Sequence, residues 1–325
     1  KKVHFFQIYG MVGISFRKAG YAGSGTDDNE KEKKMILPGD SDGFAVLEAS
    51  LFNIENFKVD GGAMFGVVPK TLWSRSVYAD SRNLCTLALR SLLVETGDRL
   101  ILIDSGWGDK QGDKFFRYVY RSGGEGLLGG LANRGYRPED VTDLVFTHLH
   151  ADHCGGAILN PVDGGAYRHQ FPNARYHISK TQWEWAVKNN LREEDSFLAE
   201  NIQPLDDGDR LNLIEKDGFL VPGFELRICS GHTPGLMYAI IDYKGKRVVY
   251  LGDLIPTVAH LPLIWNSSYE INPLKSIEEK QLILREALKN GYILAFQHDE
   301  KIECCDLKET PGGIRAKDVF AFVDI

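Results

Sequence analysis

The chain has 325 residues, of which 43% are hydrophobic and 26% are charged, a composition typical of a globular protein with a large core. Its net charge of −7 argues against nucleic acid and strongly anionic membranes as partners, because binding to phosphates requires clustered Lys and Arg. The odd number of cysteines, five, does not predict a disulfide framework, and no apolar run reaches the roughly 20 residues of a membrane span. We therefore expect a small-molecule substrate, with no nucleic acid and no membrane as partner, and a homodimer stays open.

Residues 1–43 are predicted to form an N-terminal arm and a polar linker, followed by a single domain over residues 44–325. Lys1 and Lys2 precede an apolar stretch, as in a signal peptide, but the glycines and the lack of a small-residue cleavage motif favour an irregular arm or a first strand. Residues 18–43 are rich in Gly, Asp, Glu, Lys and Ser, which is typical of a linker. We expect a cytoplasmic protein, with export or a periplasmic location as the alternative.

The first half of the domain is predicted to consist mainly of strands. In chain order, the pattern predicts a strand at 45–52, a hairpin of strands at 86–95 and 99–103 turning at Gly97-Asp98, helical segments at 113–120 and 126–133, a turn at 138–141 and a strand at 144–147. The last of these strands leads directly into a run of histidines and aspartates.

The second half mixes strands with two longer helices. In chain order, the pattern predicts a helix at 179–189 capped by Ser179, strands at 225–229, 237–242 and 247–251, a helix at 277–290 stopped by Gly291, and a strand at 292–296. Trp183 and Val187 are expected on the buried face of the first helix. The buried face of the second is expected to carry Ile277, Leu282 and Leu288, with Leu284 less well placed. This mixture favours an α+β protein in which helices flank sheets.

Four side chains that commonly bind metals lie within six residues: His148, His150, Asp152 and His153. His148 and His150 alternate, so on an extended segment they point the same way. Asp152 and His153 follow in a turn and can face the same cavity from another direction. Imidazole and carboxylate ligands suit Zn²⁺ and also Mn, Co or Fe. The density of this run indicates a metal site rather than a surface turn.

Three further candidate ligands follow predicted strands elsewhere in the chain: His232, Asp253 and His298. Each residue alone also fits an ordinary turn or capping role. Because strand ends place side chains at a common rim, the three together with the histidine run indicate one site.

The order of these motifs resembles the metallo-β-lactamase superfamily. The chain has His-x-His-x-Asp-His at 148–153, Gly-His-Thr-Pro-Gly at 231–235, Gly-Asp at 252–253 and then His298. The resemblance covers roughly residues 45 to 300 and implies an αβ/βα four-layer sandwich, with the site along one edge between two sheets. Asp104 is similar to an early aspartate of the family that is structural rather than a ligand.

The resemblance also implies a site with two metal ions, taken as Zn²⁺ with Mn, Co or Fe as alternatives. A hydroxide shared by the two ions would be the nucleophile, so that Asp152 and Asp253 are expected to serve catalysis as well as metal binding. The implied ligands are His148, His150 and His232 for one ion, Asp152, His153 and His298 for the other, and Asp253 as a bridge.

Within the superfamily, the chain most resembles N-acyl homoserine lactonases and methyl parathion hydrolases. Too few residues follow His298 for the C-terminal helices of glyoxalase II relatives, and the chain has neither a basic patch nor an inserted nuclease domain. Residues 60–70 are similar to the glycine-rich flap of the group. Met64 and Phe65 are predicted to line a substrate pocket, with Trp107 as a further wall; the alternative places all three in the core.

One departure concerns the segment after Asp253. Familiar homoserine lactonases carry a Tyr three residues after the bridging aspartate, where this chain has Pro256. Thr257 and His260 are the candidates to contact the substrate in its place, and His260 could donate a proton to the leaving alkoxide. For His260 the alternative is a satisfied turn residue.

The sequence thus predicts a metallo-hydrolase that opens lactone rings, above all those of N-acyl homoserine lactones. The alternative enzyme hydrolyses organophosphates or aryl esters, as methyl parathion hydrolases do. A third hypothesis is a metal-bound sensor or binding protein that has kept its ligands without turnover.

Overall fold

The structure is a computed structural model that describes residues 46–206 and 208–325. The predicted arm and linker of residues 1–43 lie outside the described residues, so the boundary at residue 44 stays a prediction. Of the helices in the described part of the chain, none combines the length and the apolar character that a membrane crossing requires.

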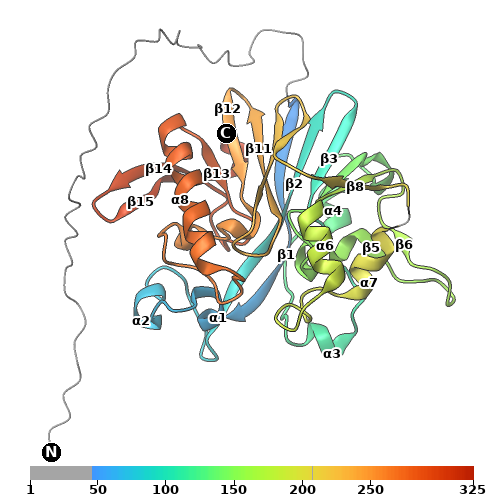
Figure 1. Cartoon of the computed structure of the whole chain (residues 1–325), viewed down its shortest axis with the longest axis horizontal. Helices are drawn as coiled ribbons and strands as arrows, with labels where there is room; N and C mark the ends of the chain where they lie inside the picture. The colour runs from blue at the N-terminus through green and yellow to red at the C-terminus, as the bar shows by residue number, and fades with distance from the viewer. Residues whose placement is uncertain (1–45, 207) are drawn as a thin grey trace, which may run out of the picture. The chain divides into compact units, whose positions relative to one another are not determined.

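A six-stranded sheet forms one half of the described domain, in the order β1-β2-β3-β4-β7-β8 (Figure 1). β1, β2 and β3 pair antiparallel, and β3, β4, β7 and β8 pair parallel. Its strands are β1 (Glu48–Asp60), β2 (Leu84–Thr96), β3 (Arg99–Ile103), β4 (Asp143–Val145), β7 (Arg175–Ser179) and β8 (Leu211–Ile214).

A seven-stranded sheet forms the other half, in the order β15-β14-β13-β12-β11-β10-β9. Its strands are β9 (Gly218–Val221), β10 (Phe224–Cys229), β11 (Leu236–Tyr243), β12 (Lys246–Tyr250), β13 (Ile293–Ala295), β14 (Cys304–Thr310) and β15 (Gly313–Phe320). A separate pair is made by β5 (Ile158–Leu159) and β6 (Arg168–His169).

Helices cover the outer faces of the two sheets. Figure 1 shows α8 outside the seven-stranded sheet and α4 and α6 outside the six-stranded sheet, so the layers run helix, sheet, sheet, helix. The α-helices are α1 (Gly61–Phe65), α2 (Lys70–Trp73), α3 (Asp113–Phe116), α4 (Leu127–Ala132), α5 (Ala151–Cys154), α6 (Lys180–Lys188), α7 (Ala199–Ile202) and α8 (Pro273–Asn290). This is the αβ/βα sandwich that the resemblance implied.

Apolar packing between the layers holds this arrangement. Leu92 and Ile103 of the six-stranded sheet share one buried cluster with Met237 and Tyr250 of the other sheet. Beneath α8, a second buried cluster joins that helix to the outer face of the seven-stranded sheet. Burial of such side chains is the main force that stabilises a layered fold, at about 25 cal/mol per Å² of apolar area.

The predicted hairpin is confirmed, together with its turn. The register pairs Thr96 with Arg99, which leaves Gly97-Asp98 as a two-residue connection. Gly97 has a φ of +55°, in the left-handed region that such tight turns require.

The predicted helices exist, but their extents and buried faces differ from the prediction. The helical segments expected at 113–120 and 126–133 shrink to the short helices α3 and α4. On α6, Ser179 caps the first turn by accepting from the backbone N–H of Gln182, and Trp183 packs against the core. Val187 is 58% exposed, so its predicted place on the buried face is wrong. The helix buries Gln182 and Ala186 instead.

Helix α8 shows the same kind of difference. It begins at Pro273, because the Asn272 side chain caps it by accepting from the N–H of Lys275, and it ends at the left-handed Gly291 as predicted. Leu284 is fully buried whereas Leu282 is 69% exposed, the reverse of the expectation. The buried face of the helix consists of Ser276, Lys280, Ile283, Leu284 and Ala287. A polar and a charged residue thus occupy buried positions, which a search for apolar residues at helical spacing does not identify.

Backbone hydrogen bonds join the two sheets at one edge, and we call this contact the inter-sheet seam. The N–H of Ala88 donates to the carbonyl of His298, and the N–H of Arg90 donates to that of Gln297, each at 3.2 Å. The Arg90 guanidinium donates to the carbonyls of Phe296 and Asp299. The end of β13 is thereby fixed against β2, beside the predicted site.

Candidate metal centre

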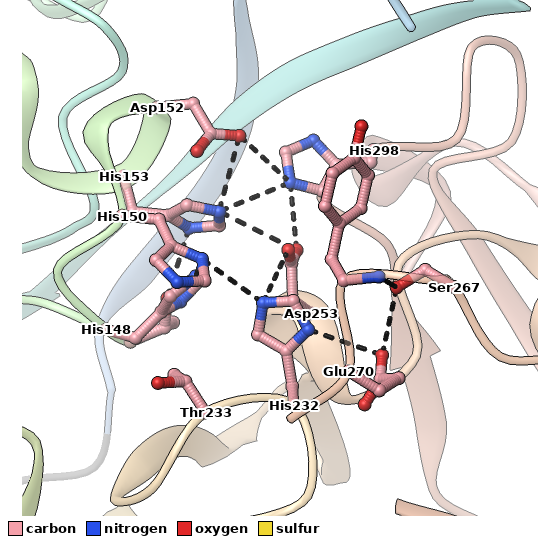
Figure 2. Close-up of polar contacts among 12 residues, drawn as sticks. His148, His150, Asp152, His153, His232, Thr233, Asp253, Ser267, Glu270 and His298 are labelled. Atoms are coloured by element: carbon pink, nitrogen blue, oxygen red, sulfur yellow. Dashed lines mark hydrogen bonds and ion pairs between the residues drawn. The ribbon is translucent and has the colours of Figure 1, made fainter. Parts of the chain in front are cut away.

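The four residues of the histidine run are positioned by a strand end and one short helix. β4 ends at Val145, and His150 has the extended conformation of the residue that precedes α5. The single turn of α5 then carries Asp152 and His153 to the same side as His148 (Figure 2). His148 and His153 are fully buried, and His150 is nearly so.

The remaining three candidate ligands follow strands of the other sheet, as predicted. His232 follows β10, Asp253 follows β12, and His298 follows β13. All seven side chains meet at one edge of the sandwich, where the carboxyl ends of these strands face one another (Figure 2). The site therefore draws four residues from the six-stranded half and three from the seven-stranded half.

The first group of donor atoms comes from three histidines. His148 Nε2 lies 2.9 Å from His150 Nδ1, and His232 Nε2 lies 3.3 Å from the same nitrogen. The ligand atoms of the three residues lie within 4.8 Å of one another, which is compact enough to surround one ion.

The second group combines a carboxylate with two histidines. His153 Nε2 lies 3.5 Å from Asp152 Oδ2 and 3.4 Å from His298 Nε2, and the distance from His298 Nε2 to Asp152 Oδ2 is 3.8 Å. These three residues form another set whose donor atoms all lie within 4.8 Å.

Asp253 lies between the two groups with one oxygen toward each. Its Oδ2 is 3.3 Å from His232 Nε2 in the first group. Its Oδ1 is 2.9 Å from His298 Nε2 and 3.6 Å from His153 Nε2 in the second. This is the arrangement a carboxylate needs to bridge two cations.

The contacts inside the cluster fit metal ions better than hydrogen bonds. Ring nitrogens of different histidines face one another at 2.9–3.4 Å. Asp253 Oδ1 is buried, and although His298 Nε2 lies 2.9 Å away, no described residue meets this oxygen in hydrogen-bond geometry. Buried polar atoms are normally paired, so convergent donors of this kind indicate a cation site. Imidazole and carboxylate donors in groups of three or four are the ligand set that Zn²⁺ takes in proteins.

The buried histidines and carboxylates of the cluster shift one another's pKa values. Burial and the neighbouring histidines hold the pKa of His148 well below its usual range, which keeps a nitrogen lone pair free for a metal. Burial also opposes charge on His153, but the carboxylates of Asp152, Asp253 and Asp104 outweigh it and raise the pKa of His153 well above its usual range. Cations at the cluster would neutralise these carboxylates in place of histidine protons.

Each histidine uses its second ring nitrogen to contact a polar group outside the cluster, which for His148 Nδ1 is the Thr147 hydroxyl at 3.1 Å. His150 Nε2 lies 3.0 Å from Glu193 Oε1, His232 Nδ1 lies 3.3 Å from Glu270 Oε1, and His153 Nδ1 lies 2.9 Å from Asp104 Oδ2. His298 Nδ1 contacts the carbonyl of Ala88 at 2.9 Å. Contacts of this kind fix the ring and direct the other nitrogen to the metal.

Asp104 organises the base of the site, in agreement with the structural role that the resemblance implied. Its carboxylate accepts from the N–H and the hydroxyl of Thr147, both at 2.7 Å, and from Gln297 Nε2 at 3.0 Å. Its φ is +58°, a conformation that is rare for a residue other than glycine and that marks a position under constraint.

Two buried glutamates belong to the site and were not predicted. Glu193 also accepts from the Thr233 hydroxyl at 2.7 Å and from Trp185 Nε1 at 2.6 Å. Burial opposes its charge, but hydrogen bonds from His150, Asn190 and Trp185 lower the pKa of Glu193 to about 2. Glu270 contacts His232 and the hydroxyls of Ser267 and Ser276. Both glutamates lie in polar stretches of sequence without a strand before them, so no pattern distinguished them.

The residues predicted to touch substrate are not gathered around the metal centre. Met64, Phe65, Thr257 and His260 line one cavity of about 100 Å³, and none of the seven candidate ligands lines it. Pockets for small-molecule ligands usually measure about 300–1,000 Å³. Met64 and Phe65 are buried in an apolar cluster, which supports the alternative that they are core residues.

The proposed catalytic role of His260 is not supported. The ring is buried and stacks on Phe65, with Nδ1 2.7 Å from the Thr257 hydroxyl and Nε2 2.8 Å from the carbonyl of Met64. Burial lowers the pKa of His260 to about 4. Both ring nitrogens are occupied by the protein, so His260 and Thr257 join the flap to the segment after Asp253 instead of facing a substrate.

Trp107 is linked to the metal centre through one aromatic ring. Its ring packs edge-on against Phe57, which in turn packs edge-on against His298, with ring centroids 5.6 Å apart in both pairs. Trp107 is half-buried, and its Nε1 has no hydrogen-bond partner among the described residues. Its contact with substrate stays a prediction.

Comparisons with known proteins place this site in a family. The sequence pattern of the metallo-beta-lactamase superfamily matches residues 90–298, which include the seven candidate ligands. An N-acyl homoserine lactonase of Bacillus cereus is 30% identical over 181 residues, 52% of this chain and 64% of the relative. The match thus spans less than two thirds of that relative's length.

Solved structures show the same fold. A structure described as a probable metal-dependent hydrolase from Staphylococcus aureus has a TM-score of 0.75 and 29% identity, covering 86% of this chain and 99% of that one. AidC, described as a dizinc quorum-quenching lactonase, has a TM-score of 0.68 at 20% identity, covering 85% and 97%. On its sequence match, layer order and metal-binding motifs, the chain belongs to the metallo-beta-lactamase superfamily.

Proposed function

We propose that this protein is a dinuclear metal-dependent hydrolase that opens lactone rings, with N-acyl homoserine lactones as the substrate class. The observation that carries the proposal is the position of Asp253, with one carboxylate oxygen toward each of two groups of three donors. The curated relative at 30% identity is named an N-acyl homoserine lactonase, which supports the substrate class.

The side chains of the cluster have a defined task in such a reaction. Two divalent ions held there, proposed to be Zn²⁺ with Mn, Co or Fe as alternatives, would lower the pKa of water toward neutrality and polarise the carbonyl of an ester. Asp253 sets the separation of the two donor groups. Glu193, Glu270 and Asp104 orient the imidazoles, and burial of the histidines keeps the donors free of competing water.

Metal analysis combined with a substrate panel tests the proposal. We expect about two ions per chain and turnover of acyl homoserine lactones across several acyl lengths. The second candidate is hydrolysis of aryl esters and phosphotriesters, which Pro256 favours because it stands where familiar homoserine lactonases have Tyr. Turnover of paraoxon-type esters without lactone opening would replace the first candidate by the second, and metal binding without either activity would indicate a binding protein.

The substitution Asp253→Asn tests the bridge directly. We expect it to reduce the metal content and to lower kcat/KM at least about 100-fold, since even residues that only orient metal ligands are worth roughly 10–100-fold. Asp242→Asn is the control, because Asp242 is an exposed residue at the far end of the neighbouring strand β11, where its carboxylate pairs with Arg247. Unchanged metal content and rate in Asp253→Asn would refute the two-metal site.

A further inference from the structure

The segment between residues 266 and 272 passes beside the metal cluster and is anchored on both sides. The N–H of Ser268 donates to the carbonyl of Ala63 in α1 at 2.7 Å. The N–H groups of Ile271 and Asn272 donate to the carbonyls of His232 and Gly231 at 2.9 and 2.8 Å. The turn is therefore held between the flap and the loop that carries His232.

Within this turn, Tyr269 lies between two residues whose positions are fixed. Its own N–H donates to the Ser267 hydroxyl at 3.2 Å, and that hydroxyl donates to Glu270 Oε1 at 3.2 Å. The same oxygen of Glu270 contacts His232 (Figure 2). The backbone of Tyr269 is thus connected to a candidate metal ligand through a short chain of hydrogen bonds.

The phenol of Tyr269 is a polar group of this turn that the described part of the protein leaves unpaired. The residue is 45% exposed, and its hydroxyl has no hydrogen-bond partner among residues 46–206 and 208–325. Burial of the ring, followed by the carboxylates of Asp152, Asp60 and Asp253, raises the pKa of Tyr269. The raised pKa keeps the hydroxyl protonated at neutral pH, and the exposure of the residue leaves it accessible to a ligand.

We propose that the Tyr269 hydroxyl donates a hydrogen bond to an oxygen of the ester bound at the metal centre, and so acts as a catalytic residue. The inference rests on the proposed function. A free donor held on an anchored turn has little conformational entropy to lose, and donors placed where negative charge develops contribute roughly 10²–10³-fold to kcat. The neighbouring polar side chains do not compete for the Tyr269 hydroxyl, because Glu270 and Ser267 are already paired with each other and Glu270 with His232.

Substitution of Tyr269 by Phe removes this donor and keeps the ring. We expect kcat on the best ester substrate of the panel to fall about 100-fold, with KM changed less, since the lost bond strengthens as charge develops. Metal content and unfolding temperature should match those of the wild type. Tyr167→Phe is the matched control, because Tyr167 is 40% exposed and lies in the loop before β6; it should leave kcat unchanged.

Comparison with Tyr269→Ala separates a donor from an apolar wall. A wall predicts full activity for Tyr269→Phe and a loss only for Tyr269→Ala, and that result would overturn the proposal. So would a loss of kcat that is matched by loss of metal from Tyr269→Phe. A wild-type protein that binds two ions but turns over no ester would refute the proposed function, whereas an active wild type with an equally active Tyr269→Phe would refute only this role.

Discussion

Each of the two glutamates behind the metal centre contacts one candidate ligand. Glu193 touches no other member of the cluster than His150, and it keeps that ring turned so that Nδ1 faces the first donor group. Glu270 does the same for His232. The affinity of the first group for its ion therefore depends on residues that would not contact the ion.

The substitution Glu193→Gln tests this dependence. Gln keeps the size of the side chain but loses its charge, so the imidazole of His150 becomes less basic and its orientation less defined. We expect metal affinity to fall about 10–100-fold, with the stronger effect on one of the two ions. Competition with a chelator, followed by metal analysis, measures the change. Glu194→Gln, at an exposed neighbour, is the control, and equal metal affinity in both variants would contradict the role of Glu193.

The seven candidate ligands could be found from sequence because they stand in a dense run or directly after apolar strands. Glu193 and Glu270 could not, since their contacts with His150 and His232 are made across the fold by ordinary polar loops. The predicted role of His260 is not supported, for the opposite reason. This residue follows Asp253 closely, yet the chain turns it into the apolar cluster of Phe65, where its ring nitrogens are paired.

At the scale of the elements, a buried ion network joins three strands of the six-stranded sheet. Asp143 in β4 lies 2.7 Å from His177 Nε2 in β7, and its other oxygen accepts from Arg99 Nε in β3 at 2.7 Å. Burial opposes the charge of Asp143, but the hydrogen bonds from His177, Arg99 and Thr142 outweigh it and lower the pKa of Asp143 strongly. The network thus favours the ionised carboxylate in the folded protein.

This network predicts a pH dependence of stability. A carboxyl whose pKa is lower in the folded than in the unfolded chain stabilises the fold above its unfolded pKa of about 3.9, and this contribution is lost as the pH falls through the folded value. We expect Asp143→Asn to lower the free energy of unfolding at pH 7 by roughly 3–5 kcal/mol, because a buried pair is broken. The difference from the wild type should shrink below about pH 4. Urea unfolding at several pH values measures it, and a difference independent of pH would contradict the assignment.

Elements with a clear apolar period were predictable, and those without one were not. The hairpin of β2 and β3 turns at Gly97-Asp98, residue types that favour a two-residue turn, and the pairing of the strands follows from this turn. β14 and β15 were missed, because they form the edge of the seven-stranded sheet and carry charged side chains such as Lys308 and Asp318 on their exposed positions. In α8, the buried Lys280 hid the face of the helix, since its Nζ donates to the carbonyls of Pro262 and Trp265.

At the scale of the whole described domain, the metal centre spans both sheets. Four donors come from the six-stranded half and three from the other, so bound ions would join the halves at this edge. The layer order followed from the family resemblance rather than from element patterns, because local periodicity does not determine which sheet faces which. The residues that join the halves were therefore predictable as ligands, but not as a link between sheets.

Removal of the metal should accordingly lower the stability of the domain. Ions bound at about 1,000 times their dissociation constant stabilise a fold by about 4 kcal/mol, which for a domain of this size corresponds to roughly 10 °C in Tm. We expect dialysis against a chelator to lower Tm by about that amount and readdition of Zn²⁺ to restore it. Calorimetry measures both steps. Asp253→Asn should show a smaller shift, and a wild-type Tm insensitive to chelation would argue against ions that span the sheets.

The inter-sheet seam has a consequence for how the centre is filled. Its bonds run between main-chain groups of Ala88, Arg90, Gln297 and His298, so they do not depend on any ion. Small zinc domains collapse without their metal, because nothing else brings their ligands together. Here, the main-chain hydrogen bonds of the inter-sheet seam keep His298 opposite the histidine run in the metal-free protein. Metal should then bind to a preformed site, at a rate set by diffusion and dehydration of the incoming ion rather than by refolding of the chain.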